Sequence, residues 1–222
     1  MKYRVRYLLI MLIFVVSAVV YIDRSNISIA GAYLAADYHI SNIELGWVFS
    51  AFLLGYAAFQ IPAGWVVGKL GPRKTLTWGL IWWSTLSVCT ALVPSNMDHA
   101  LWALIATRFV LGLGEAVAYP SANQFIAAWF PSHERGKANG WVFGGVGLGS
   151  GLAPPLVAAI VYNYGWHEVF YFSAGLGLVM AFAWYKLARD TPAQHPSVTP
   201  QELAHIQADP SVKMKGHAGP VP

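Results

Sequence analysis

The sequence contains six apolar stretches, and each is long enough to cross a lipid bilayer as a helix. A transmembrane helix needs about 20 mostly apolar residues to span the hydrocarbon core. Because that core holds no water, a spanning segment must satisfy its backbone hydrogen bonds internally, which favours helices. Turn-forming or charged residues separate the stretches. The six expected helices cover residues 7–36, 45–67, 75–93, 100–130, 136–162 and 166–187.

The composition excludes an ordinary soluble domain. Of the 222 residues, 56% are hydrophobic and 11% are charged, whereas soluble chains have about 45–50% apolar and about 25% charged residues. The first stretch is not expected to be a cleaved signal peptide, because it is too long, lacks a small-residue cleavage site and contains Asp23 and Arg24. The sequence therefore predicts an all-α, multi-pass integral membrane protein of the inner or plasma membrane.

The positions of the basic residues predict the orientation of the spans. Twelve of the fourteen Lys and Arg residues lie before the first stretch, around the second and fourth connections, or after the sixth stretch. The connections 37–44, 94–99 and 163–165 have none. Since Lys and Arg accumulate in cytoplasmic loops, both termini are expected in the cytoplasm. The net charge of +4 then reflects topology, and no nucleic-acid partner is expected.

The chain divides into residues 1–189, which form the six-helix transmembrane domain, and residues 190–222, a polar cytoplasmic linker or tail. We expect the tail to be flexible, with a short helix near residues 200–208. Its His195, His205 and His217 are too far apart to suggest a metal site, and the single Cys89 excludes a cysteine-based metal cage. No metal site and no cofactor is predicted.

Four ionisable residues lie deep in the expected spans: Asp23 and Arg24 in the first, Arg108 and Glu115 in the fourth. Each costs about 2.5–3.5 kcal/mol at the bilayer centre on insertion scales, so such residues mark a polar pathway or neutralise one another. Ion pairs that only hold helices together are the alternative. Apolar residues would serve that purpose at lower cost, which favours the functional interpretation.

The spacing within the fourth span brings two of these charges onto one face. Arg108 and Glu115 are seven residues, or two helical turns, apart, which separates them by about 10 Å along the axis. Gly112 lies between them and is expected to leave room there.

Polar side chains in the first two spans complete the expected cavity. Tyr21 and Arg24 share one face of the first span, and Tyr56 and Gln60 lie one turn apart in the second. Six helices around these groups would enclose a polar cavity near the middle of the membrane.

The charge balance of this cavity suggests a coupling mechanism. Two arginines and two carboxylates sum to zero, so the fully ionised site does not attract an anion. Protonation of Asp23 or Glu115 would leave an arginine available for a substrate carboxylate. Proton binding and anion binding would then promote each other, as a proton–anion symporter requires.

The fifth span is rich in glycine, which lets another helix approach closely. Gly145 and Gly149 form one small pair, and Pro154 and Pro155 are expected to break the regular hydrogen bonding. A stripe at i, i+4, i+7 and i+11 consists of Gly140, Gly144, Gly147 and Gly151.

The pattern of charged residues resembles the major facilitator superfamily, and in particular its anion:cation symporter group. Residues 21–26 read YIDRSN, similar to the Y-x-D-R-x-N of that group, and residues 108–115 read RFVLGLGE. Pro120, residues 129–131 (WFP) and residues 134–136 (ERG) continue the resemblance. The charged first and fourth spans each begin a triplet, as expected for two inverted three-helix repeats.

This resemblance implies the N-terminal six-helix half of a transporter that moves a small organic anion, such as a sugar acid, together with protons. It implies that Arg24 anchors the substrate carboxylate, with Tyr21 and Tyr56 as further contacts and Gln60 on the same face as Tyr56. The partners would be the anion, protons, the bilayer and a C-terminal six-helix half or a second copy. Proton coupling would fall to Asp23, Glu115 and Arg108.

The loop after the second span departs from the family pattern G-x-x-x-D-R-x-G-R-R. Here the corresponding residues are Gly64, Lys69, Gly71 and Arg73, and Gly68 stands where the family has an acidic residue. That acidic residue is implied to help latch the outward-facing state, so the latch would differ here.

Two alternatives compete with the symporter interpretation. A membrane-embedded serine enzyme would use Ser150, but His167, expected near the opposite membrane face, offers no positioned base, so no enzyme is expected. A truncated or split-transporter partner that does not itself transport is the other alternative, because helices seven to twelve of the family do not follow.

Overall fold

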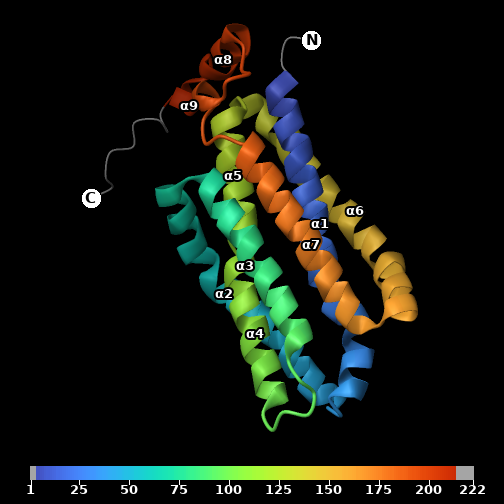
Figure 1. Ribbon diagram of the computed structural model, residues 1–222. Coiled ribbons are helices and arrows are strands. Elements are labelled where there is room, and N and C mark those ends of the chain that lie inside the picture. Colours follow the sequence, from blue (N-terminus) through green and yellow to red (C-terminus); the bar gives the residue numbers. More distant parts are fainter. Residues whose placement is uncertain (1–3, 214–222) are drawn as a thin grey trace.

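The computed structural model describes residues 4–213, which form one helical bundle (Figure 1). Long antiparallel helices make up the bundle, and short helical pieces follow it. No strand occurs among the described residues. The long helices are α1 (Arg4–Asp37), α2 (Asn42–Leu70), α3 (Pro72–Leu92), α4 (Ala100–Glu115), α5 (Ala118–Trp129), α6 (Ser132–Tyr164) and α7 (Trp166–Leu187). The short pieces are the 3-10 helix η1 (Pro192–Gln194), α8 (Pro200–Gln207) and α9 (Pro210–Lys213).

Local chemistry explains where several helices begin. The Ser41 hydroxyl accepts from the backbone N–H of Glu44, and the Glu44 carboxylate accepts from that of Ser41, which is a capping box at the start of α2. The turns before α3 and α7 are made by Gly71 (φ 81°) and Gly165 (φ 98°), a conformation that glycine adopts readily.

The helix neighbours are those of two related three-helix repeats. The most extensive contacts are between α1 and α6, between α2 and α4, and between α3 and α7 (Figure 1). In two such repeats, α1, α2 and α3 correspond to α4 (with α5), α6 and α7. The contact between α1 and α6 therefore corresponds to the contact between α4 and α2, and the α3–α7 contact corresponds to itself. The bundle therefore has the arrangement expected for the six helices.

The expected fourth span is two helices rather than one. A turn at Ala116 and Val117 separates α4 from α5 directly after Glu115. Pro120 explains the break, because it has no N–H to donate to the carbonyl four residues earlier, that of Ala116. Pro154 and Pro155 lie within α6, which continues through them. Neither has an N–H to donate to the carbonyl four residues earlier, so the regular hydrogen bonding is interrupted there without ending the helix.

Five helical segments are long and apolar enough to cross a membrane on length and composition, with α4 and α5 counted together. The expected third span, α3, is not among them. Its Thr and Ser side chains lower its mean hydropathy. Most of these side chains face the bundle interior, among them Thr75, Ser84, Ser87 and Thr90. It still runs the length of the bundle beside α2, α4 and α7 (Figure 1).

Gly145 and Gly149, the small pair expected from the sequence, bring α6 close to α1. A Cβ atom at Gly145 or Gly149 would meet the backbone of α1 at Phe14 or Ala18. Gly112 likewise faces the backbone of α2 and leaves no room beside Glu115, contrary to expectation. Most of the stripe faces open space instead: a Cβ would meet nothing within 4 Å at Gly140, Gly147 and Gly151.

One end of the bundle carries the basic loops. The start of α1, the α2–α3 and α5–α6 connections and the end of α7 all meet there, together with α8 and α9 (Figure 1). We call this the basic end. The other three connections, which have no Lys or Arg, lie at the opposite end.

The described part of the tail packs against the basic end, which differs from the flexible segment expected. The helix near residues 200–208 is present as α8, and its Ile206 is fully buried. The Glu202 carboxylate accepts from the backbone N–H of Arg6 at 3.1 Å and so satisfies an N–H at the first turn of α1. Asp209 accepts from both the N–H and the hydroxyl of Ser132 at 2.6 Å at the start of α6.

Two of the tail histidines, His195 and His205, are half-buried against the bundle. His195 lies against Trp129, with ring centroids 5.8 Å apart. His205 lies beside Glu134, with its Nε2 atom 3.0 Å from the carboxylate. The sequence spacing of these histidines gave no sign of this, because their neighbours come from another helix. His217 lies outside the described residues.

Candidate functional site

The centre of the site is an ion pair between α1 and α4. The Arg24 Nη2 atom lies 2.9 Å from Glu115 Oε2, and Arg24 Nε donates to the same oxygen at 3.2 Å. The Glu115 side chain is 1% exposed, whereas that of Arg24 is 23% exposed. Glu115 is thus enclosed by the helices, whereas part of the Arg24 side chain remains exposed and is accessible to another anion.

Aromatic rings from α1 and α2 surround the Arg24 guanidinium. Its central carbon lies 4.6 Å from the ring centroid of Tyr56, 5.3 Å from that of Phe52 and 5.8 Å from that of Tyr21. Ring faces attract a cation at such distances. The rings therefore hold the guanidinium in place even when its carboxylate partner is neutral.

Asp23 points in another direction, into the packed interior. It is 2% exposed, and its Oδ1 atom accepts from the Ser87 hydroxyl of α3 at 2.9 Å. Its Oδ2 atom is buried and has no hydrogen-bond partner among the described residues. Keeping this carboxylate charged costs free energy, because no hydrogen bond from the described residues replaces the lost hydration of its second oxygen.

Arg108 also lies in the interior, on α4, but pairs with neither carboxylate directly. It is 2% exposed, and its guanidinium carbon lies 5.6 Å from the ring centroid of Phe170. Among the described residues no carboxylate oxygen lies within 4.0 Å of it. Nearby polarity comes from Asn26, which donates to the Ser173 hydroxyl between α1 and α7.

The structure brings most of the predicted substrate-site residues together, with one looser member. Tyr21, Arg24 and Tyr56 are in contact, and Glu115 joins them through the ion pair. Gln60 lies one turn beyond Tyr56, half-buried, and makes no side-chain hydrogen bond with the described residues. Phe52 and Ser87 were missed, because nothing in the sequence tells which residue of a neighbouring helix faces a given charge.

The α2–α3 loop is fixed to the end of α7. Asp190 Oδ1 accepts from the backbone N–H of Arg73 at 2.8 Å, and the Arg73 guanidinium donates to the Tyr185 carbonyl at 3.0 and 2.7 Å. A Cβ at Gly71 would collide with the Asp190 carboxylate. Asp190 therefore supplies a carboxylate to this loop, and the sequence comparison had missed it.

The other residues of this motif lie within α2 and face outward. The Lys69 ammonium lies 3.8 Å from the ring centroid of Trp65. A Cβ would meet nothing within 4 Å at Gly64 or Gly68.

Comparison with known proteins identifies relatives along almost the whole chain. The Major Facilitator Superfamily pattern matches residues 13–219. The probable galactarate/D-glucarate transporter GarP of Escherichia coli is 35% identical over 218 residues, which is 97% of this chain and 48% of the relative. The probable sulfoacetate transporter SauU of Cupriavidus necator is 38% identical over 190 residues, 85% of this chain and 43% of the relative.

A further relative is the D-galactonate transporter of Escherichia coli, 33% identical over 204 residues, 92% of this chain and 46% of the relative. The chain spans about half the length of the curated relatives it matches. These relatives are named as transporters, not as enzymes.

Solved structures agree with the fold. The proton:xylose symporter XylE superposes with a TM-score of 0.74 at 18% identity, covering 94% of this chain and 50% of that one. A bacterial homologue of the lysosomal transporter Spinster superposes with a TM-score of 0.73 at 21% identity, covering 90% and 47%. At these identities the likeness concerns the fold alone.

Proposed function

The chain belongs to the Major Facilitator Superfamily, and from this premise we propose that it supplies the anion-binding half of a proton-coupled organic-anion symporter. The substrate class is a small carboxylate of the sugar-acid type, by analogy with the galactarate, glucarate and galactonate transporters among its relatives. The observation that carries the proposal is the ion pair of a partly exposed Arg24 with a buried Glu115.

Arg24 can exchange its anionic partner, Glu115, for the carboxylate of a substrate. While Glu115 is ionised, it occupies Arg24 and competes with any incoming carboxylate. When Glu115 takes up a proton, its charge disappears and the Arg24 guanidinium is available for a two-point contact with the substrate carboxylate. Proton and anion binding then favour each other, and this reciprocity is the thermodynamic requirement for coupling.

The surroundings of Arg24 suit this exchange. Tyr21, Phe52 and Tyr56 hold the guanidinium by their ring faces, so it need not move far when its partner changes. The Tyr21 and Tyr56 hydroxyls are suited to the hydroxyl groups of a sugar acid, and Gln60 extends the polar face by one turn. We therefore assign substrate contacts to Tyr21, Arg24, Tyr56 and Gln60.

Asp23 and Arg108 form the second element of the proposed coupling. Both side chains are buried and incompletely hydrogen-bonded. The Oδ2 atom of Asp23 and the Nε atom of Arg108 have no hydrogen-bond partner among the described residues. A proton on Asp23 would leave Arg108 as the only full charge in that part of the interior. We propose that Asp23 titrates during the cycle and that Ser87 orients its carboxylate.

The basic end is proposed to face the cytoplasm, in a plasma or inner membrane, because Lys and Arg gather there. The motif of Gly64, Lys69, Gly71 and Arg73, at the junction of α2 and α3, would then rearrange at the cytoplasmic side during alternating access. The open glycine face of α6 and the Tyr56–Gln60 face of α2 are the surfaces proposed for a second six-helix half or a second copy.

Uptake measurements test the proposal. Residues 1–222 are joined to the second half of the galactarate/D-glucarate relative, and uptake of labelled galactarate, D-glucarate and D-galactonate is followed under an inward proton gradient. Saturable uptake is expected for at least one of these anions. Arg24→Ala is expected to abolish it, while Lys137→Ala, which removes an exposed basic residue at the start of α6, leaves it unchanged. Full uptake by Arg24→Ala would reject the assigned anion site.

A further inference from the structure

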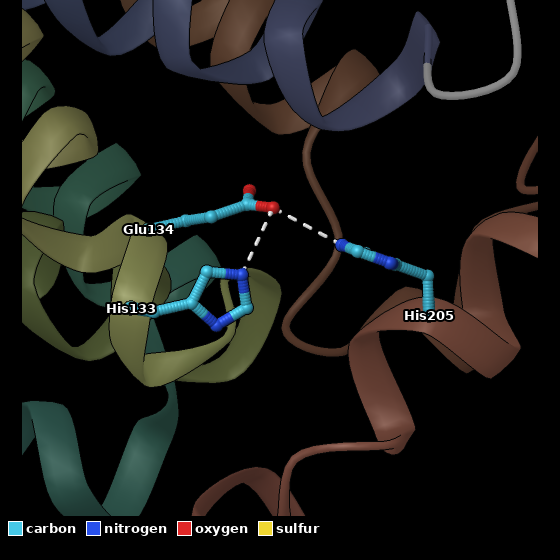
Figure 2. A group of neighbouring side chains, drawn as sticks. All are labelled: His133, Glu134 and His205. Atoms are coloured by element: carbon cyan, nitrogen blue, oxygen red, sulfur yellow. Dashed lines mark hydrogen bonds and ion pairs between the residues drawn. The ribbon is translucent and has the colours of Figure 1, made fainter.

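A cluster of two histidines and a glutamate lies at the basic end, separate from the Arg24–Glu115 site. His133 and Glu134 belong to the first turn of α6, and His205 belongs to α8 of the tail (Figure 2). We propose that these three side chains bind a divalent transition-metal ion, with Zn²⁺ as the best match. The proposal does not depend on the transport function.

The donor atoms are already close enough to share one ion. Glu134 Oε1 lies 3.0 Å from His205 Nε2 and 3.7 Å from His133 Nε2, and all three donor atoms lie within 4.8 Å of one another. Figure 2 shows both rings directed at the same carboxylate oxygen. Ligands of a tetrahedral zinc ion, each about 2.0–2.2 Å from the metal, are about 3.4 Å apart. The two distances from the carboxylate oxygen lie on either side of that value.

The donor set selects the class of metal. Imidazole suits zinc, copper and nickel, whereas magnesium and calcium prefer oxygen ligands. Two imidazoles and one carboxylate leave a position for water. The side chain of His133 is 70% exposed, that of His205 is 32% exposed and that of Glu134 is 19% exposed, so an ion can enter from the solvent.

Glu134 is held in place by a residue that does not bind the metal. Its Oε2 atom lies 2.8 Å from Arg6 Nη1, and Arg6 Nη2 also donates to Oε1 at 3.4 Å. Arg6 therefore fixes the orientation of the carboxylate and shares the Oε1 atom with the histidines. Metal ligands in proteins are commonly oriented by such a second hydrogen-bonding partner. The positive charge of Arg6 opposes a cation, but carboxylates act against it: Glu202 binds the Arg6 backbone and Asp209 binds Ser132.

Metal binding replaces the hydrogen bond between His205 and Glu134. In that bond the His205 Nε2 atom carries a hydrogen and donates it to the carboxylate. To bind the metal, the Nε2 atom must instead offer its lone pair. The ion would join α6 directly to α8 and so fix the tail on the bundle.

The test uses the untagged 222-residue protein in detergent and ZnCl₂ as the probe. Calorimetry is expected to show one zinc ion per chain, and MgCl₂ is expected to give no binding. His133→Asn and His205→Asn are each expected to weaken zinc binding at least tenfold. His99→Asn is the matched control, an exposed histidine at the opposite end, and is expected to change nothing. Unchanged affinity in the His133→Asn/His205→Asn double variant would overturn the proposal.

Two measurements on the parent protein avoid any dependence on how the variants fold. X-ray absorption of the zinc-loaded protein is expected to show two imidazole ligands, and fewer than two would overturn the site. Hydrogen exchange of the backbone amides in residues 200–207 is expected to slow when zinc binds. Unchanged exchange would contradict the bridge between α6 and α8.

Discussion

Arg24 differs from the three other charged residues inside the bundle in keeping part of its surface exposed. Its side chain is 23% exposed, whereas Asp23, Arg108 and Glu115 are at most 2% exposed. The two buried carboxyl groups can exchange protons, whereas Arg108 keeps its charge but is not exposed to a ligand. Arg24 is the one of these four that both carries a permanent positive charge and can be reached by an anion.

Helical spacing in the sequence indicated the residues that share a face with Arg24, but not all of its neighbours on other helices. The spacing of Tyr21 and Arg24 on α1 correctly placed them on one face, and Tyr56 lies beside them as expected. Helical periodicity says which residues share a face of one helix, but it does not fix the rotation or height of the helix packed against it. Ser87 therefore could not be assigned to Asp23, nor Phe52 to Arg24.

At the residue scale, the pKa of His195 is predicted to lie below the ordinary histidine value of about 6.5. Burial lowers the pKa of its ring, because desolvation disfavours the charged form, although a hydrogen bond to the Leu187 carbonyl opposes this. Its Nδ1 atom accepts from the Ser197 N–H at 3.2 Å, which a protonated ring cannot do. The neutral His195 ring favours the docked tail. Its contribution to stability is fully present above about pH 6.5, the ordinary pKa of histidine, and is lost as the pH falls through the lowered pKa of the docked state.

Ring titration by NMR checks this prediction. The midpoint for His195 should lie below the ordinary histidine value of about 6.5. A midpoint at or above that value would show that the ring is not buried against the bundle in its neutral form.

At the scale of the helices, the positions of the spans could be predicted from the amino-acid pattern, but the contacts between them could not. Long apolar runs bounded by turn residues predicted the ends of the helices to within about four residues. The break after Glu115 was missed because Pro120 falls inside an apolar run. The packing of α8 was missed because it depends on Glu202, Asp209 and Ile206 meeting the ends of α1 and α6, which are distant in sequence.

The glycines of α6 give a prediction at this scale. Gly149→Ala is expected to lower the free energy of unfolding by about 1–3 kcal/mol, because the new Cβ would meet the backbone of Ala18 and the helices would have to separate. Gly147→Ala is the matched control two residues away. It meets nothing within 4 Å and should stabilise the helix by about 0.5–1 kcal/mol. Thermal unfolding in detergent would measure both, and equal effects would contradict the assigned α1–α6 contact.

At the scale of the whole molecule, the distribution of charge predicts the orientation in the membrane. Single cysteines are introduced at Asn96 and Lys137 in a Cys89→Ser background, since both positions are exposed and lie at opposite ends of the bundle. An impermeant thiol reagent on intact cells is expected to label position 96 and to leave position 137 unlabelled. The opposite pattern would place the basic end outside the cell.

The isolated 222 residues are predicted not to transport by themselves. Alternating access in this class moves one six-helix half against another, and the chain spans about half the length of its relatives. Proteoliposomes that contain only this chain, under an inward proton gradient, should show no saturable uptake of labelled sugar acids. Saturable uptake that depends on the gradient would show instead that two copies form a working pair.

The central claim is that the proton on Glu115 decides whether Arg24 binds the substrate. Glu115→Gln mimics the protonated carboxyl but cannot release the proton. In a transporter that carries residues 1–222 as its first half, the Glu115→Gln variant is expected to retain exchange of labelled for unlabelled anion across the membrane. It should lose accumulation driven by a pH gradient. Glu44→Gln, an exposed glutamate at the start of α2, serves as the control and should keep both activities. Equal gradient-driven accumulation by Glu115→Gln and the parent would contradict the account.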